Sequence, residues 1–133
     1  MAKSFTLGKG ERLKSRKLID QLFSTGQRFN NGPFRVTYAF GGDEAVLQFG
    51  IGAGTRHFAK AADRNRVKRL SREAWRLSNT ILKQAVTQQK RSLYVFLVYT
   101  GKELPEYATV LNNMEKIISN LVRLLNEKNN TTP

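Results

Sequence analysis

The sequence contains no cysteine and only one histidine. The lack of cysteine excludes disulfides, thiolate nucleophiles and zinc sites built on cysteine. A single histidine excludes a metal site built on several histidines and leaves little for acid–base catalysis. No apolar run approaches the ~20 residues that span a bilayer, and the first residues lack the apolar segment of a secretory signal. We therefore expect a cytoplasmic protein that has no membrane segment, metal site or catalytic residues of its own.

Acidic residues are also scarce. The 133 residues include 10 Asp and Glu against 23 Lys and Arg, which gives a formal net charge of +13. Such an excess of one sign repels itself and attracts a polyanion. The phosphate backbone of a nucleic acid is the first candidate, and an anionic membrane surface is the second.

The length and composition predict one domain with a hydrophobic core, because 133 residues with 40% hydrophobic content can bury a core. Both ends of the chain are polar and offer little to bury. We expect a flexible basic N-terminal arm over residues 1–14, a folded α/β domain over 15–125, which is the candidate nucleic-acid-binding unit, and a frayed C-terminal tail over 126–133.

Hydrophobic periodicity predicts an α+β fold, with helices packed on a small sheet. The predicted helices cover residues 15–24, 63–82 and 107–125. The predicted strands cover residues 33–40, 45–51 and 93–99, with a further strand over 52–58 left open. A glycine-containing loop between the first two strands favours an antiparallel hairpin. The continuous apolar run of the last strand is typical of a central strand buried on both faces.

The helix over 63–82 has two opposite faces at 100° per residue. Asp63 is its expected N-cap, and Trp75 is expected at the boundary between the faces. The expected core side consists of Val67, Leu70, Ala74, Leu77 and Ile81. The opposite side carries Asn65, Lys68, Arg69, Arg72 and Arg76, flanked by Arg64 and Arg66. Cations repeated every turn of about 5.4 Å suit a phosphate backbone, and the planar forks of arginine suit bidentate phosphate contacts.

Residues 64–73 read Arg-Asn-Arg-Val-Lys-Arg-Leu-Ser-Arg-Glu. This segment resembles the "RNR motif" of the protein component of bacterial ribonuclease P. Residues 18–26 resemble the first helix of that family, which ends in Phe-x-x-Gly, and the order of elements fits from about residue 13 to residue 125. The resemblance implies a single-domain αβββαβα sandwich with a left-handed βαβ crossover, similar to the second domain of ribosomal protein S5.

The resemblance also implies a function. A large catalytic RNA with bound Mg²⁺ would remove the 5′ leader of precursor tRNA, and the protein, inactive alone and requiring no protein partner, would bind both RNAs. The implied contacts to the catalytic RNA are Arg56, Lys60, Arg64, Asn65, Arg66, Lys68, Arg69, Arg72 and Arg76. A cleft between the first helix and the sheet would receive the leader, with Ile19, Phe23, Arg35 and Thr37 as its residues.

The residues leave some alternatives open. A structural, ribosomal-type RNA-binding protein shares the composition, and only the RNR motif separates it from a ribonuclease P subunit. A DNA-binding regulator would use the 63–82 helix in a major groove, but arginines along the whole helix favour backbone contact over base readout. Phe23 fits a base-stacking position or the core equally well. Either the side with Phe34 and Val36 or the side with Arg35 and Thr37 can line the cleft.

Overall fold

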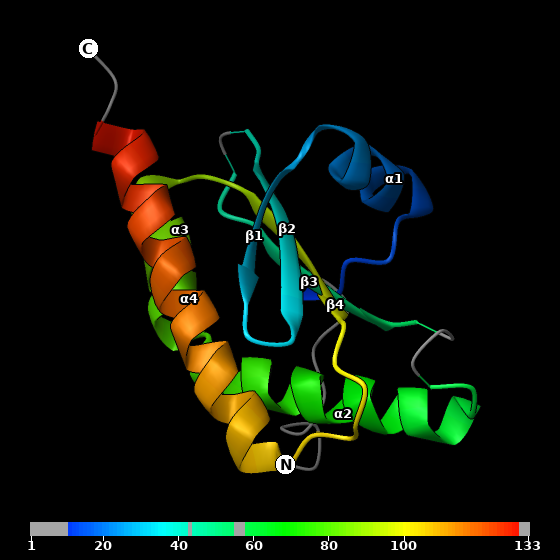
Figure 1. Cartoon of the computed structure of the whole chain (residues 1–133). Helices are drawn as coiled ribbons and strands as arrows, with labels where there is room; N and C mark the ends of the chain where they lie inside the picture. Colours follow the sequence, from blue (N-terminus) through cyan, green and yellow to red (C-terminus); the bar gives the residue numbers. More distant parts are fainter. Residues whose placement is uncertain (1–10, 43, 55–57, 131–133) are drawn as a thin grey trace, which may run out of the picture.

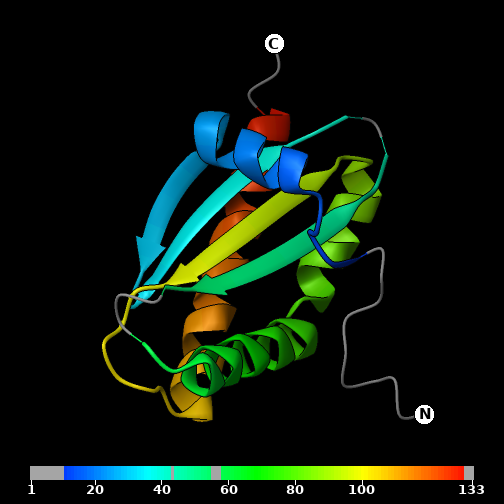
Figure 2. The same cartoon turned by 90° about the vertical axis from the view of Figure 1, so that its right-hand side faces the viewer.

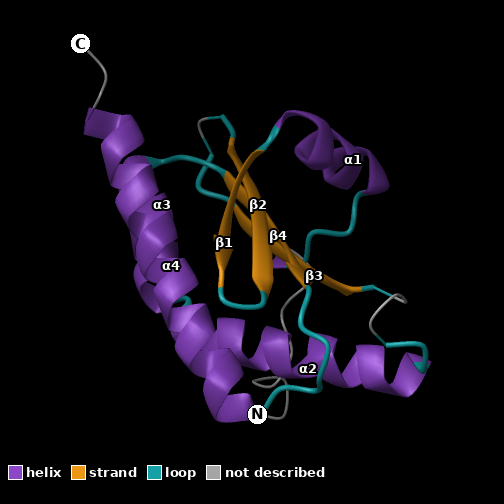
Figure 3. Cartoon of the chain, in the orientation of Figure 1, coloured by secondary structure: helices purple, strands orange, loops and turns teal. Residues whose placement is uncertain are grey.

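The computed structural model describes residues 11–42, 44–54 and 58–130. The chain combines helices and strands in the α+β class that the sequence predicts (Figures 1 and 3). The elements are α1 (Arg16–Thr25), β1 (Gln27–Asn31), β2 (Phe34–Phe40), β3 (Leu47–Ala53), α2 (Ala61–Ser78), α3 (Thr80–Gln89), β4 (Leu93–Tyr99) and α4 (Tyr107–Asn130).

The four strands form one mixed sheet in the order β1-β2-β4-β3. Strand β2 pairs antiparallel with both β1 and β4, whereas β3 runs parallel to β4. The predicted hairpin between 33–40 and 45–51 is therefore wrong, because β4 lies between these two strands. An almost wholly apolar strand buries most surface at the centre of a sheet, and β4 is that strand.

The hairpin that does form joins β1 to β2, and β1 was not predicted. Its sequence is polar apart from Phe29, and most of its residues are exposed at the sheet edge. Gly32 makes the turn with a φ of 54°, a conformation that suits glycine. Of the further strand left open over 52–58, residues 52 and 53 belong to β3, and residues 55–57 lie outside the described ranges.

The two faces of the sheet have different partners. Figure 2 shows α1 on one side of the sheet and α4 on the other. The face toward α2, α3 and α4 carries the hydrophobic core, which includes Phe34, Val36, Tyr38, Phe49, Ile51, Val95 and Leu97. Helix α1 packs on the opposite face mainly through the buried Leu22.

The predicted helix over 63–82 is interrupted. Residue Asn79, which is buried, separates α2 from α3, and α3 then runs alongside α4 (Figure 1). The side chains of Leu77 and Ile81, expected in the core, are 54% and 51% exposed. Trp75, expected at a boundary, is 1% exposed and stacks on Phe49, with 4.2 Å between ring centroids. The core side of α2 is rotated toward the indole because a large aromatic surface gains most from burial.

Part of each predicted terminal segment belongs to the folded unit. Leu13 is buried, and its N–H donates to the carbonyl oxygen of Phe49 at 2.9 Å. Glu11 forms an ion pair with Lys83 of α3 at 2.5 Å. At the other end α4 continues to Asn130, past the expected start of the tail at 126. Over the described ranges, no helix combines the length and apolarity needed to cross a bilayer.

Candidate RNA interface

The RNR segment lies in the first two-thirds of α2, which has a strongly basic composition. Between Ala61 and Ser78 there are six Arg or Lys residues against two acids, Asp63 and Glu73. The N-cap of the helix is Lys60 rather than the predicted Asp63, which lies in the first turn. A carboxylate at that position still interacts favourably with the positive end of the helix dipole.

The basic side of α2 predicted from the sequence lies away from the core, although Trp75 replaces Leu77 on the buried side. The buried Val67, Ser71 and Ala74 lie roughly opposite to it. The exposed members of the predicted set are Lys60, Asn65, Arg66 and Arg69, and the half-buried members are Arg64, Lys68, Arg72 and Arg76. Arg56 lies outside the described residues.

Arg64 differs from the other members because it holds its own loop. Its guanidinium donates to the carbonyl oxygens of Phe58 at 2.8 Å and of Ala59 at 2.9 Å. These bonds fix the entry of the chain into α2. The first arginine of the motif therefore has a structural role in addition to its charge.

Arg72 has a cationic neighbour that sequence reasoning missed. Burial lowers the pKa of Arg72, and the positive charge of Arg12 lowers it further. Arg12 comes close to α2 because it forms a bridge with Phe49, whose ring stacks on Trp75. Nothing in the polar N-terminal segment indicates that Arg12 lies near Arg72. We use the name basic face for the following residues of α2 and its N-cap, together with Arg12: Lys60, Arg64, Asn65, Arg66, Lys68, Arg69, Arg72 and Arg76.

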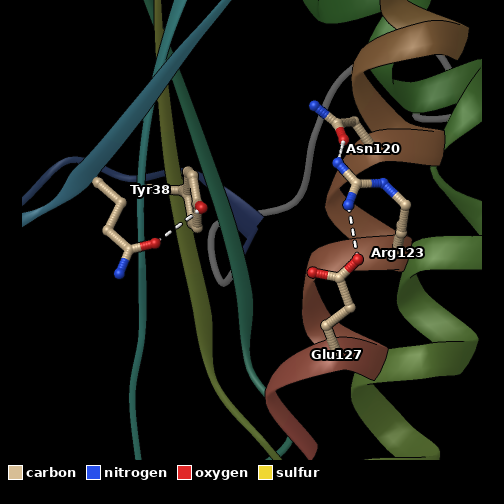
Figure 4. Close-up of polar contacts among 5 residues, drawn as sticks. Tyr38, Asn120, Arg123 and Glu127 are labelled. Atoms are coloured by element: carbon tan, nitrogen blue, oxygen red, sulfur yellow. Dashed lines mark hydrogen bonds and ion pairs between the residues drawn. The ribbon is translucent and has the colours of Figure 1, made fainter. Parts of the chain in front are cut away.

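Basic residues elsewhere can be neutralised locally. On α4, Arg123 donates to the carboxylate of Glu127 at 2.6 Å and to the side-chain oxygen of Asn120 (Figure 4). The charge of Arg123 is thus balanced within α4.

Nearby, the Tyr38 hydroxyl donates to the side-chain oxygen of Gln27 at 2.8 Å (Figure 4). Burial is the main cause that raises the pKa of Tyr38.

The second candidate surface is the sheet face that carries α1, here called the open face. Strand alternation and register place two rows of residues across it. One row consists of Arg28, Thr37, Phe96 and Gly50, and the next consists of Asn30, Arg35, Val98 and Gly52. Of the two alternatives left by the sequence, the Arg35 side therefore faces α1, and the side with Phe34 and Val36 lies in the core.

Phe23 lies at the edge of α1 and belongs to the open face rather than the core. Its side chain is 36% exposed, and its ring meets that of Phe96 in a T-shaped contact with centroids 5.3 Å apart. Ile19, one helical turn earlier, is half-buried. Arg35 is exposed on the open face, whereas Thr37 is only 1% exposed and offers no surface to a ligand. Phe96, the partner of Phe23, was not predicted, because its strand reads as uniformly buried.

These features define a class of protein: a small α+β protein with a basic helix and a partly uncovered sheet face, which is typical of nucleic-acid binding. The family model described as "Ribonuclease P" matches residues 7–122. A ribonuclease P protein component from Porphyromonas gingivalis is 36% identical over 117 residues, covering 85% of this chain and 84% of that protein. The chain therefore belongs to the ribonuclease P protein family.

Solved structures of the family have the same fold. The ribonuclease P protein of Staphylococcus aureus aligns with a TM-score of 0.63 at 17% identity, covering 85% of this chain and 96% of that one. The protein from Thermotoga maritima aligns with a TM-score of 0.60 at 24% identity, covering 83% and 96%. The α+β architecture predicted from the resemblance is thus confirmed.

Proposed function

We propose that this protein is the RNA-binding subunit of ribonuclease P and assists the removal of the 5′ leader from precursor tRNA. The observation that carries the proposal is the basic face of α2, built on the RNR segment in a chain of this family. The ribosomal-type and DNA-binding alternatives gain no support from the comparisons.

The two candidate surfaces suit two different RNA ligands. Helices α1 and α2 lie at opposite ends of the molecule in both Figure 1 and Figure 2, with uncovered strands between them. A row of arginines suits the regular phosphates of a folded catalytic RNA. Aromatic rings beside a cation suit unpaired bases, and the open face supplies the exposed ring of Phe23, the half-buried ring of Phe96 against it and the exposed Arg35. The catalytic RNA would bind the basic face, and the leader would bind the open face.

The hydrolysis itself is assigned to the RNA and its Mg²⁺. Over the described ranges, no three Asp, Glu, His or Cys side chains gather where they could hold a metal ion. Among the described residues, the side chains therefore do not fit a Mg²⁺ ion held by the protein alone. The protein contributes cations that offset the repulsion between the phosphates of the two RNAs.

The direct test is cleavage of labelled precursor tRNA by the catalytic RNA at low Mg²⁺, with and without the protein. We expect the protein to restore cleavage, because its cations replace the screening that Mg²⁺ provides at high concentration. Protein that has been freed of RNA and treated with ribonuclease should leave the precursor intact. Leader removal by such protein alone would contradict the assignment of catalysis to the RNA.

Phe23→Ala tests the assignment of the open face to the leader. We expect holoenzyme made with this variant to bind precursor tRNA more weakly by about 1–3 kcal/mol, the contribution of one base–aromatic stack. Mature tRNA has no leader, so its affinity should stay nearly constant. Both affinities and the melting temperature of the variant are measured. Parallel losses for the two tRNAs together with a large drop in melting temperature would place Phe23 in a core role instead.

A further inference from the structure

We propose that Phe96 is a positioning residue for the leader site, which holds the ring of Phe23 in the orientation that stacks on an unpaired base. This inference rests on the proposed function and adds a residue, a supporting surface and a ligand group to it. The ligand group is a single unpaired nucleobase, recognised by its flat face and not by its sequence.

Phe96 lies over a stretch of β3 that has no side chains on the open face, because Gly50 and Gly52 face that side and Ile51 lies in the core. A Cβ atom added to Gly50 would lie 2.6 and 2.8 Å from two atoms of the Phe96 ring, closer than any real contact. A Cβ atom on Gly52 would lie 3.4 and 3.6 Å from two others, an ordinary contact distance. The ring therefore leans from β4 across onto the backbone of β3, and Gly50 is the position that makes room for it.

Phe96 in turn fixes the orientation of Phe23. The two rings meet at an interplanar angle of 69°, the edge-to-face arrangement that aromatic quadrupoles favour. The backbone at this point is held as well, because Arg28 donates to the carbonyl oxygen of Phe23 at 2.6 Å. The exposed ring is thus held at its backbone and its side chain before any ligand arrives. Preorganisation of this kind lowers the entropy cost of binding.

The neighbouring row supplies what a nucleotide needs besides a stacking surface. Arg35 is exposed in the row next to Phe96, where its guanidinium can reach a backbone phosphate. Val98, half-buried opposite Arg35, adds apolar surface. An aromatic ring of fixed orientation, an apolar surface beside it and an adjacent cation are typical of sites for single-stranded nucleic acid.

Three glycine substitutions test whether the position of the Phe96 ring matters for leader binding, because they crowd this ring to different degrees. Reconstituted holoenzyme is titrated with precursor and with mature tRNA, and each variant is melted. Gly50→Ala should weaken precursor binding about fivefold without changing the affinity for mature tRNA. Gly52→Ala should have a smaller effect, and Gly42→Ala, which meets no atom within 4 Å, should have none. Equal effects of Gly50→Ala and Gly42→Ala on precursor affinity, in folded proteins, would overturn the proposal.

A double-mutant cycle separates positioning from direct stacking and remains informative if Gly50→Ala does not fold. Phe96→Leu should weaken precursor binding about fivefold, and Phe23→Ala about tenfold. The double variant should be no weaker than Phe23→Ala, because Phe96 acts only through the other ring. Phe29→Leu, the same truncation at a half-buried ring of β1 that packs against the core and not in the leader site, controls for loss of an aromatic ring from the sheet. A multiplicative loss of about 50-fold would overturn the positioning role and make Phe96 a stacking residue itself.

Failure of this inference can be told apart from failure of the proposed function. If all variants stimulate cleavage at low Mg²⁺ and Phe23→Ala retains its selective effect, the leader site stands and only the role of Phe96 is rejected. If Phe23→Ala has no selective effect on precursor tRNA, the leader site itself is rejected. In that case the inference is rejected as well, because Phe96 acts only through the ring of Phe23.

Discussion

Replacing Arg69, Arg72 and Arg76 together by alanine is expected to lower the affinity for the catalytic RNA about 500-fold at 0.1 M monovalent salt. Each phosphate contact contributes about 0.9 to the slope of log K against log salt concentration. Three lost contacts therefore reduce the slope by about 2.7, which at 0.1 M corresponds to nearly three powers of ten. The effect on binding should shrink as the salt concentration rises.

The fold should tolerate this replacement. Arg72 lies close enough to Arg12 for the two positive charges to repel each other, so removing one of them relieves an unfavourable interaction. Melting curves and a titration over 0.05–0.5 M salt provide the measurement. Arg123→Ala is the matched control, because Arg123 is paired with Glu127 on α4. A triple variant whose salt slope equals that of the control would show that the basic face is only solvated surface.

Trp75→Ala is expected to destabilise the protein by about 3–5 kcal/mol, the usual cost of truncating a buried Trp. The Trp75 side chain is 1% exposed, and the plane of its indole lies at 15° to the plane of the Phe49 ring. Its loss would open a cavity between α2 and β3 and weaken the contact that carries Arg12 toward α2. For a domain of this size we expect the melting temperature to fall by roughly 10–20 °C.

Leu77→Ala is the matched comparison for this prediction. The helical periodicity of the sequence places Leu77 in the core and Trp75 at a boundary, whereas the structure leaves Leu77 54% exposed. Truncation of an exposed surface residue usually changes stability by no more than about 0.5 kcal/mol. Chemical denaturation of both variants distinguishes the two arrangements. A larger loss for Leu77→Ala than for Trp75→Ala would favour one continuous helix over the break at Asn79.

The sequence by itself determined the features that depend on local order. The cationic side of α2 follows from the 3.6-residue period, because residues three and four apart share a face whatever the helix packs against. The RNR segment and its family follow from ten consecutive residues. Strands over 34–40 and 93–99 follow from runs of apolar and alternating side chains, which exclude most other local structures.

Only the tertiary structure decided which segments meet. The position of β4 between β2 and β3, the polar edge strand β1 and the exchange of Leu77 for Trp75 in the core all depend on competition for buried surface between distant segments. The same holds for the electrostatic effect of Arg12 on Arg72 and for the contact of Phe23 with Phe96, which relate residues 60 and 73 positions apart. Such contacts form because packing minimises exposed apolar area over the whole chain at once, a quantity that no local window of sequence contains.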